Sequence, residues 1–251
     1  MPRIARKDLG TNMFHVIVQG IAKEYIFEKE EYIIQYLYLI KKYCQEHDIR
    51  IIAYCIMNNH AHFMFYAEKI IEMSKAMQRT NVVYSKYYNK KKQRVGYVFR
   101  NRYVSEPIIK EEQLLNCIVY IHKNPLKAKI VKSEKEYMYS SYNEYVEKYG
   151  IINEETIKFI FGSSKDYKEQ FKYIHENSNE EFKDIYNDLI EKTEKICINY
   201  LLTKNITVEK IVEDEKELRK FLIEMKEKNN ISNRKLAGFL GINREKIRKI
   251  K

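Results

Sequence analysis

Two histidines lie one residue apart in the stretch MNNHAHFMF, residues 57 to 65. Because side chains on a strand alternate between its two faces, His60 and His62 would share a face, with their Cβ atoms about 7 Å apart. Two imidazoles in that arrangement can converge on one divalent cation through their ring nitrogens. The alternative is a pair of half-exposed histidines without a ligand, so a metal site here requires a third ligand.

A tyrosine and an asparagine on another element are candidate partners. Tyr120 and Asn124 lie in KEEQLLNCIVYIHKNP, where apolar residues recur at helical spacing, so both would occupy one face of a helix over residues 111–124. Pro125 disfavours helical geometry in the residue before it, which predicts that the helix ends near Asn124. Each residue also has an ordinary structural role, Tyr120 as a core tyrosine with its hydroxyl in water and Asn124 as an N-cap.

The elements that must position these residues alternate between strand and helix patterns. The predicted elements are a strand over 14–20, a helix over 28–47, a β-hairpin of 49–57 and 60–66, a helix over 68–90 and a strand over 96–104. Asn58 and Asn59 would form the hairpin turn, because asparagine tolerates the positive φ of tight turns. From about residue 151 only helical patterns occur, so the predicted fold class is α+β followed by an all-helical C-terminal region.

The end of the chain has a pattern of its own. The segment ISNRKLAGFLGINREKIRKIK has the helix, glycine turn and helix of a helix-turn-helix near residues 230–251. A helical hairpin that merely packs on a core is the alternative. We therefore predict a main domain over residues 1–150 and a helical region over residues 151–251.

Charge is concentrated in one segment of a chain whose net charge is +11. Between Lys75 and Tyr103 there are nine Lys or Arg residues and no Asp or Glu, with tyrosines interleaved. That pattern is typical of a nucleic-acid interface, although a solvated helix and loop would look similar. The predicted DNA contacts are Arg79, Lys86, Lys90, Lys91, Lys92, Arg94, Arg100 and Arg102.

The cysteines and the apolar runs indicate a compartment. Four scattered cysteines without a CxxC pair predict reduced core thiols, as in a cytosolic protein. No uninterrupted apolar stretch of about 18 residues is present, so neither export nor membrane insertion is indicated. We expect a cytoplasmic, nucleoid-associated protein.

Five segments in chain order carry a resemblance to a known family. MNNHAHFMF, MQRTNVVYSKYYNKK, GYVFRNRYVSE, YIHKNPLKAKIV and YSSYNEY resemble the HUH single-tyrosine transposases of the IS200-like superfamily, and within them the REP-associated tyrosine transposase group. The resemblance covers roughly residues 1–150. It implies a ferredoxin-like or RRM-like antiparallel sheet flanked by helices, the HUH fold. Two departures are QGIAK, where the family often has RGN, and Tyr139, where it usually has tryptophan.

The resemblance also implies roles for single residues. Tyr120 matches the nucleophile that attacks single-stranded DNA, and His60, His62 and Asn124 match the ligands of Mg²⁺ or Mn²⁺. It implies a metal-dependent transposase that cleaves and rejoins DNA beside hairpin or palindromic sequences through a 5′-phosphotyrosine intermediate, and it allows a homodimer. The sequence itself suggests that His15 is a core or hydrogen-bonded histidine, and that His122 is an exposed helix residue or at most a DNA contact.

Two other functions remain open at this stage. A non-catalytic module that binds single-stranded DNA or RNA could use the same sheet and basic segment, with the C-terminal region acting in regulation. A replication nuclease of the same HUH chemistry is the second alternative, but such enzymes usually carry a helicase or a second tyrosine.

Overall fold

The chain folds into two compact units, one ending at residue 182 and one beginning at residue 183. This computed structural model describes residues 10–250 except 101, 148–149, 164, 179–181, 183–184 and 230. The predicted boundary at residue 150 falls inside the first unit, because Ile152, Ile157 and Phe171 belong to the same core as the sheet.

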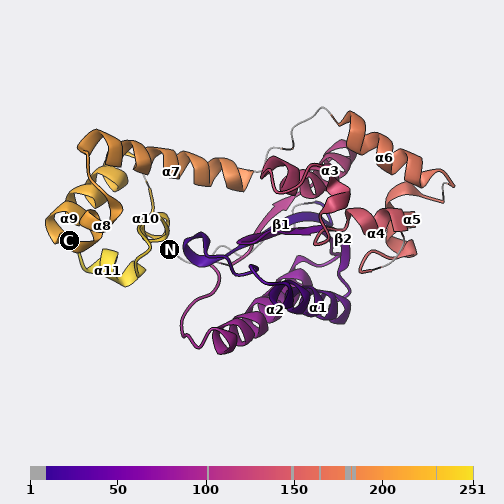
Figure 1. Ribbon diagram of the computed structural model, residues 1–251, viewed down its shortest axis with the longest axis horizontal. Helices are drawn as coiled ribbons and strands as arrows, with labels where there is room; N and C mark the ends of the chain where they lie inside the picture. Colours follow the sequence, from indigo (N-terminus) through magenta and orange to yellow (C-terminus); the bar gives the residue numbers. More distant parts are fainter. Residues whose placement is uncertain are drawn as a thin grey trace. The chain divides into compact units, whose positions relative to one another are not determined.

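A four-stranded antiparallel sheet organises the first unit (Figure 1). Its strands are β1 (Met13–Gln19), β2 (Arg50–Ile56), β3 (His60–Tyr66) and β4 (Val104–Pro107), in the order β2-β3-β1-β4. With α1 (Glu30–Glu46) between β1 and β2 and α2 (Ile70–Lys91) between β3 and β4, this is the ferredoxin-like arrangement. The predicted fold class is therefore confirmed, with β1 and β3 as the two central strands.

The two faces of the sheet are covered by different helices (Figure 1). One face is apolar, with Phe14, Val16 and Phe63 in the core, and α1 and α2 lie against it. The opposite face carries α3 (Glu111–Lys127), and it is the face to which both histidines of β3 point.

The hairpin and the fourth strand differ from prediction in detail. Neither Asn58 nor Asn59 adopts a positive φ; instead, their carbonyls accept hydrogen bonds from the amides of Phe27 and Gly20, at 2.8 Å each. The strand predicted over 96–104 begins only at Val104. Part of that stretch still extends the sheet, because Phe99 bridges Gly20 at the end of β1.

Helix α3 continues through Pro125 to Lys127, so the predicted end near Asn124 is wrong. Proline has no N–H for the carbonyl four residues back. Here the Asn124 side-chain amide donates to the carbonyls of Tyr120 at 2.8 Å and Ile121 at 3.4 Å. Asn124 therefore lies within the helix, where it compensates for the missing donor, and is not an N-cap.

Three α-helices follow α3 in the described part of the first unit. They are α4 (Tyr142–Glu147), α5 (Glu154–Phe161) and α6 (Tyr167–Asn177). His122 of α3 is fully buried against α6, with Nδ1 2.9 Å from His175 Nε2 and Nε2 2.8 Å from Ser141 Oγ. The prediction of an exposed His122 is therefore wrong, because α6 covers that side of α3.

This histidine pair predicts a pH-dependent stability. Burial lowers the pKa of His175 to about 4 and that of His122 well below its usual value. The unfolded chain then binds more protons below pH about 6.5, so the free energy of unfolding should fall by up to about 1.4 kcal/mol per pH unit for each histidine as the pH drops toward 4. Urea unfolding at several pH values measures the slope of the unfolding free energy against pH. For His175→Gln this slope should be smaller by the contribution of about one proton. An unchanged dependence would contradict this assignment.

The second unit is helical throughout its described residues. It contains α7 (Ile185–Lys204), α8 (Val208–Glu213), α9 (Glu215–Ile223), a π-helical turn (Glu224–Lys228), α10 (Asn233–Leu240) and α11 (Arg244–Lys249). Leu218, Phe221, Leu236 and Ile247 are buried in its separate core. The predicted helical C-terminal region is confirmed.

Two expectations drawn from composition can be compared with the structure. All four cysteines are buried and none forms a disulfide. Within the described residues, no helix is long and apolar enough to cross a membrane.

Candidate active site

The two histidines of β3 occupy the centre of the sheet face below α3. In the register of β1 and β3, Gln19 is opposite His60 and Ile17 is opposite His62, so both histidines lie on the face away from α1 and α2. Their ring centroids are 4.9 Å apart, with the planes at 81°. His62 is buried and His60 is half-buried, so one edge of the pair is open to solvent.

Hydrogen bonds define which ring nitrogen of each histidine is available. His60 Nδ1 lies 2.6 Å from Asn59 Oδ1, which can only accept, so Nδ1 carries the proton and Nε2 has the lone pair. His62 Nδ1 lies 3.0 Å from Nε2 of His15, while His62 Nε2 is buried and has no hydrogen-bond partner among the described residues. Both available nitrogens are therefore Nε2.

His15 connects the pair to a carboxylate, a role that sequence reasoning missed. It is fully buried, as predicted, and its ring is stacked on that of His62 at 5.2 Å. Its Nδ1 is 3.6 Å from Oε2 of Glu106, the residue opposite it on β4. A carboxylate near Nδ1 favours the proton there, so Nε2 accepts from His62 and leaves the His62 lone pair on Nε2. The sequence contains no signal for this contact, because it depends on the pairing of β1 with both β3 and β4.

Burial keeps both histidines uncharged at neutral pH. Desolvation lowers the pKa of His60 to about 4 and lowers that of His62 well below its usual value, with His60, His15 and Lys127 adding smaller effects on His62. Neutral imidazole is the form that ligates a metal ion. An unpartnered Nε2 on a neutral, buried histidine therefore fits a cation ligand.

Asn124 is the candidate third metal ligand, which would bind through its side-chain oxygen. Its Nδ2 is engaged by the helix backbone, and in the described part of the chain its Oδ1 makes no hydrogen bond. Among the described residues, no group of three or more His, Cys, Asp and Glu side chains is placed to hold a metal ion. A cation on the histidine pair would thus take its remaining ligands from an amide such as Asn124, from water or from a phosphate.

Tyr120 lies directly over the histidines. Its ring centroid is 5.6 Å from that of His62 and 5.8 Å from that of His15, both edge-on. Only 8% of the residue is exposed, and Phe182 packs against its ring at 5.3 Å. The candidate nucleophile Tyr120 and the candidate metal ligand His62 are therefore brought together from two elements far apart in sequence.

Lys127 is a further member of the site that the sequence analysis did not identify. Its Nζ lies 4.6 Å from the centroid of the Tyr120 ring, a cation–π distance. Lys127 follows Tyr120 by two helical turns, so the spacing was informative, but the predicted helix ended at Asn124. A positive charge here favours negative charge on Tyr120 or on a phosphate beside it.

The basic segment divides into engaged and available side chains. Four of the predicted DNA contacts form ion pairs with carboxylates on or before α1: Arg79 with Glu46, Lys91 with Glu31, Lys92 with Glu28 and Arg94 with Glu24. Lys86, Lys90 and Arg102 make no ion pair in the described part of the chain. Exposed pairs of this kind contribute only about 0–1 kcal/mol each. The four basic side chains could therefore exchange their carboxylate partners for phosphates.

Arg100 is hydrogen-bonded to the strand residue that lies opposite His60. Its amide donates to the Gln19 carbonyl at 2.9 Å, and its guanidinium donates to Gln19 Oε1 at 3.3 Å. Gln19 is the β1 residue opposite His60. Of the eight predicted contacts, Arg100 is thus tied to the candidate site by backbone pairing.

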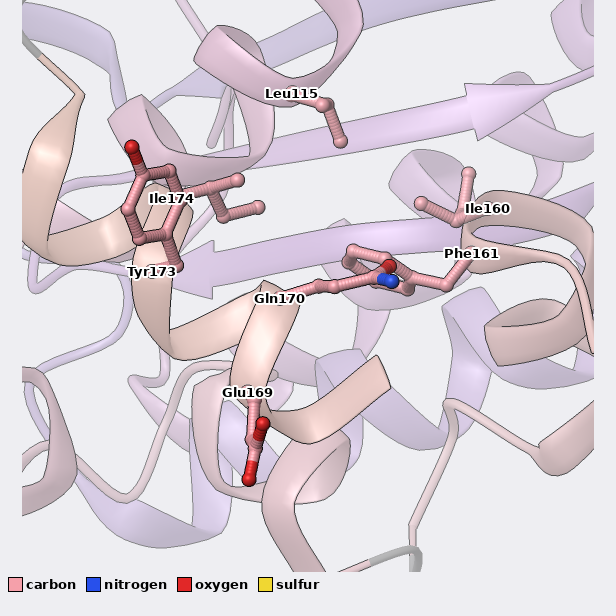
Figure 2. A pocket seen from close by; sticks show the side chains of 7 residues that line it. All are labelled: Leu115, Ile160, Phe161, Glu169, Gln170, Tyr173 and Ile174. Atoms are coloured by element: carbon pink, nitrogen blue, oxygen red, sulfur yellow. The ribbon is translucent and has the colours of Figure 1, made fainter. Parts of the chain in front are cut away.

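An apolar pocket elsewhere in the first unit is separate from this site (Figure 2). It lies between α3, α5 and α6 and is lined by side chains that include Leu115, Phe161 and Tyr173. None of the proposed catalytic residues lines it.

The fold and the site together define a class. A ferredoxin-like sheet with a histidine pair on a central strand, and a tyrosine on the helix above it, is the arrangement implied by the resemblance to HUH single-tyrosine proteins. Residues 10–124 match the model of the family described as "Transposase IS200 like". This match covers less than half of the chain and shows that the segment is similar to that family, in agreement with the resemblance.

Two individual proteins are similar to the chain. A provisionally named REP-associated tyrosine transposase of Haemophilus influenzae is 25% identical over 147 residues, which cover 55% of this chain and 82% of that protein. A solved structure of a REP-associated tyrosine transposase bound to a REP hairpin is 16% identical, with a TM-score of 0.49, and the match covers 60% of this chain and 90% of that one.

Proposed function

We propose that the chain is a metal-dependent transposase that cleaves and rejoins single-stranded DNA beside hairpin or palindromic sequences. Tyr120 forms the 5′-phosphotyrosine intermediate, and His60, His62 and Asn124 hold Mg²⁺ or Mn²⁺. The protein acts where its DNA substrate is, in the cytoplasm and on the nucleoid. The observation that carries the proposal is the 5.6 Å approach of the Tyr120 ring to the ring of His62.

The chemistry requires little beyond these groups. The Tyr120 oxygen forms a bond to phosphorus, the bond from phosphorus to the 3′ oxygen breaks, the phenol loses its proton and the leaving oxygen gains one. A phenol has a pKa of about 10 and is a poor nucleophile at neutral pH, so the charge of Lys127 assists as negative charge develops. When bound, the metal ion would polarise the scissile phosphate. The phosphotyrosine bond is retained for rejoining, so no nucleotide cofactor is required.

Labelled DNA hairpins with single-stranded flanks test the proposal. With Mn²⁺, denaturing electrophoresis should show a covalent adduct that carries label placed 3′ of the cleaved bond, and a free fragment that carries label placed 5′ of it. EDTA should prevent both. Metal-independent binding of the same hairpins without any adduct would instead support a non-catalytic DNA-binding module.

The basic segment gives a paired prediction for DNA binding. We propose all eight basic residues named above as DNA contacts. Arg100 and Arg102 should contribute most, because Arg100 is hydrogen-bonded to Gln19 beside the histidine pair and Arg102 makes no ion pair in the described part of the chain. DNA would first have to replace the ion pairs of Lys91 and Lys92 with glutamates. Arg100→Gln/Arg102→Gln should weaken hairpin binding about tenfold. It should also reduce the slope of log affinity against log salt concentration by about two. Lys91→Gln/Lys92→Gln is the matched control, with less effect on affinity at equal change in charge. Equal losses for both pairs would refute this ranking.

Lys127 gives a prediction for the rate of the covalent step. Lys127→Met removes the charge beside Tyr120 but retains an unbranched side chain, so adduct formation should slow by about tenfold with little change in hairpin affinity. Lys132→Met, at an exposed position beyond α3, should leave the rate unchanged. An unchanged rate for Lys127→Met would exclude an electrostatic role for Lys127.

A further inference from the structure

The second unit contains a basic surface that the proposed transposase chemistry does not use. We propose that α10 and α11 form a helix-turn-helix that binds duplex DNA, with Arg244, Arg248 and Lys249 of α11 contacting the phosphates and the groove. This inference goes beyond the proposed function and does not depend on it, because it concerns neither the histidine pair nor Tyr120.

The turn between the two helices is held by a left-handed glycine and by hydrogen bonds. Helix α10 ends at Gly241, whose φ of 67° and ψ of 22° lie in the left-handed region that favours glycine. The amide of Ile242 donates to the Ala237 carbonyl at 3.1 Å, and Asn243 caps α11 by accepting from the Glu245 amide at 2.9 Å. These bonds stabilise a three-residue turn between the two helices, a connection of the length found in helix-turn-helix motifs.

The packing leaves one side of α11 exposed. Leu236, Ala237 and Leu240 of α10 and Ile247 of α11 are buried in the core of the second unit together with residues of α9. Arg244, Glu245, Arg248 and Lys249 are exposed around the rest of α11. The core therefore holds α11 by one apolar side chain and presents its charged side outward.

Charge in the second unit is concentrated at this motif. Residues 231–250 contain six basic residues and one acidic residue, whereas residues 185–230 contain nine basic and ten acidic residues. Lys246 donates to the Val212 carbonyl at 2.8 Å, and Arg248 pairs with Glu245 at 3.0 Å. Arg244 and Lys249 have no ion pair in the described part of the chain, so their charges are available to a polyanion.

Duplex DNA is the polyanion that this geometry fits. An α-helix fits the major groove of B-DNA, which is about 12 Å wide, whereas the deep, narrow major groove of an RNA duplex does not admit it. Arg244 and Arg248 are one turn apart, so they can contact neighbouring phosphates on one groove edge. Duplex binding by the second unit would keep the chain on double-stranded DNA until a single-stranded site becomes accessible to the first unit.

Fluorescence anisotropy of the full chain can test this inference without cleavage. The probe is a 30-base-pair DNA duplex without palindromes, in EDTA, titrated at several KCl concentrations. Arg244→Gln/Lys249→Gln should weaken binding about tenfold and make the log–log salt dependence shallower by about two, since each phosphate contact contributes about 0.9. Lys204→Gln/Lys216→Gln, exposed on α7 and α9, is the control with equal charge change and should bind as the native chain does.

The outcomes separate this inference from the proposed function. Native duplex binding that both double variants lose equally, equal affinity for duplex RNA, or no duplex binding would each overturn the inference. None of these results bears on adduct formation with hairpins, which is measured with metal on single-stranded DNA. Circular dichroism and thermal unfolding of both variants verify that lost binding is not lost folding.

Discussion

We expect Tyr120→Phe to lose the covalent adduct and to retain hairpin binding. The substitution removes one oxygen and keeps the ring, so the contacts with His15, His62 and Phe182 remain available to phenylalanine. Loss of a nucleophile can cost about 10⁶-fold in rate, and we expect a loss of at least about 10³-fold. Denaturing electrophoresis measures the adduct, and anisotropy in EDTA measures the binding.

The chain offers a matched control for this variant. Tyr142→Phe removes the hydroxyl of another buried tyrosine, which packs against His122 and not against His60 or His62. It should form the adduct at the native rate. If Tyr120→Phe still forms adduct, Tyr120 is not the nucleophile; if both variants lose it, the effect is structural.

Much of the first unit was predictable because its patterns are local. Alternation in HAHFMFY placed both histidines on one face, and this holds because the β1 register leaves Phe63 and Phe65 for the apolar core. The spacing of Tyr120 and Asn124 likewise placed them on one side of α3. Periodicity gives the face of an element, and at this site the face was the decisive information.

The errors come from contacts that no local pattern contains. His122 has charged and apolar neighbours on its own helix, and it is buried because later segments cover it: α4 supplies Tyr142, and α6, about fifty residues later, supplies His175 and Phe171. The boundary near 150 reflected a change in pattern, yet α5 and α6 pack on the first unit. Pro125 was interpreted as a helix end because proline disfavours helical geometry in the residue before it. The sequence alone did not show that the Asn124 side-chain amide would donate to the Ile121 carbonyl.

The largest effect on metal binding is expected from the histidine pair. His60→Ala and His62→Ala should each weaken Mn²⁺ binding to the DNA-free chain by at least about 100-fold, since even loss of a supporting contact costs about 10–100-fold. Titration calorimetry measures this directly, without any reaction. His60→Ala is the more informative variant, because His60 is half-buried and its removal leaves less of a cavity than removal of His62.

Variants of His15 should give an intermediate result in the same Mn²⁺ titration. His15→Phe keeps a ring for stacking on His62 but removes the acceptor for its Nδ1 proton, so the proton can move to Nε2 and block the ligand position. We expect an intermediate loss of Mn²⁺ affinity, about 10–100-fold, and partial recovery in His15→Gln, whose amide oxygen can accept. His175→Gln, at a buried histidine outside the site, should bind Mn²⁺ as the native chain does. Native affinity in both His60→Ala and His62→Ala would exclude a metal site on this pair.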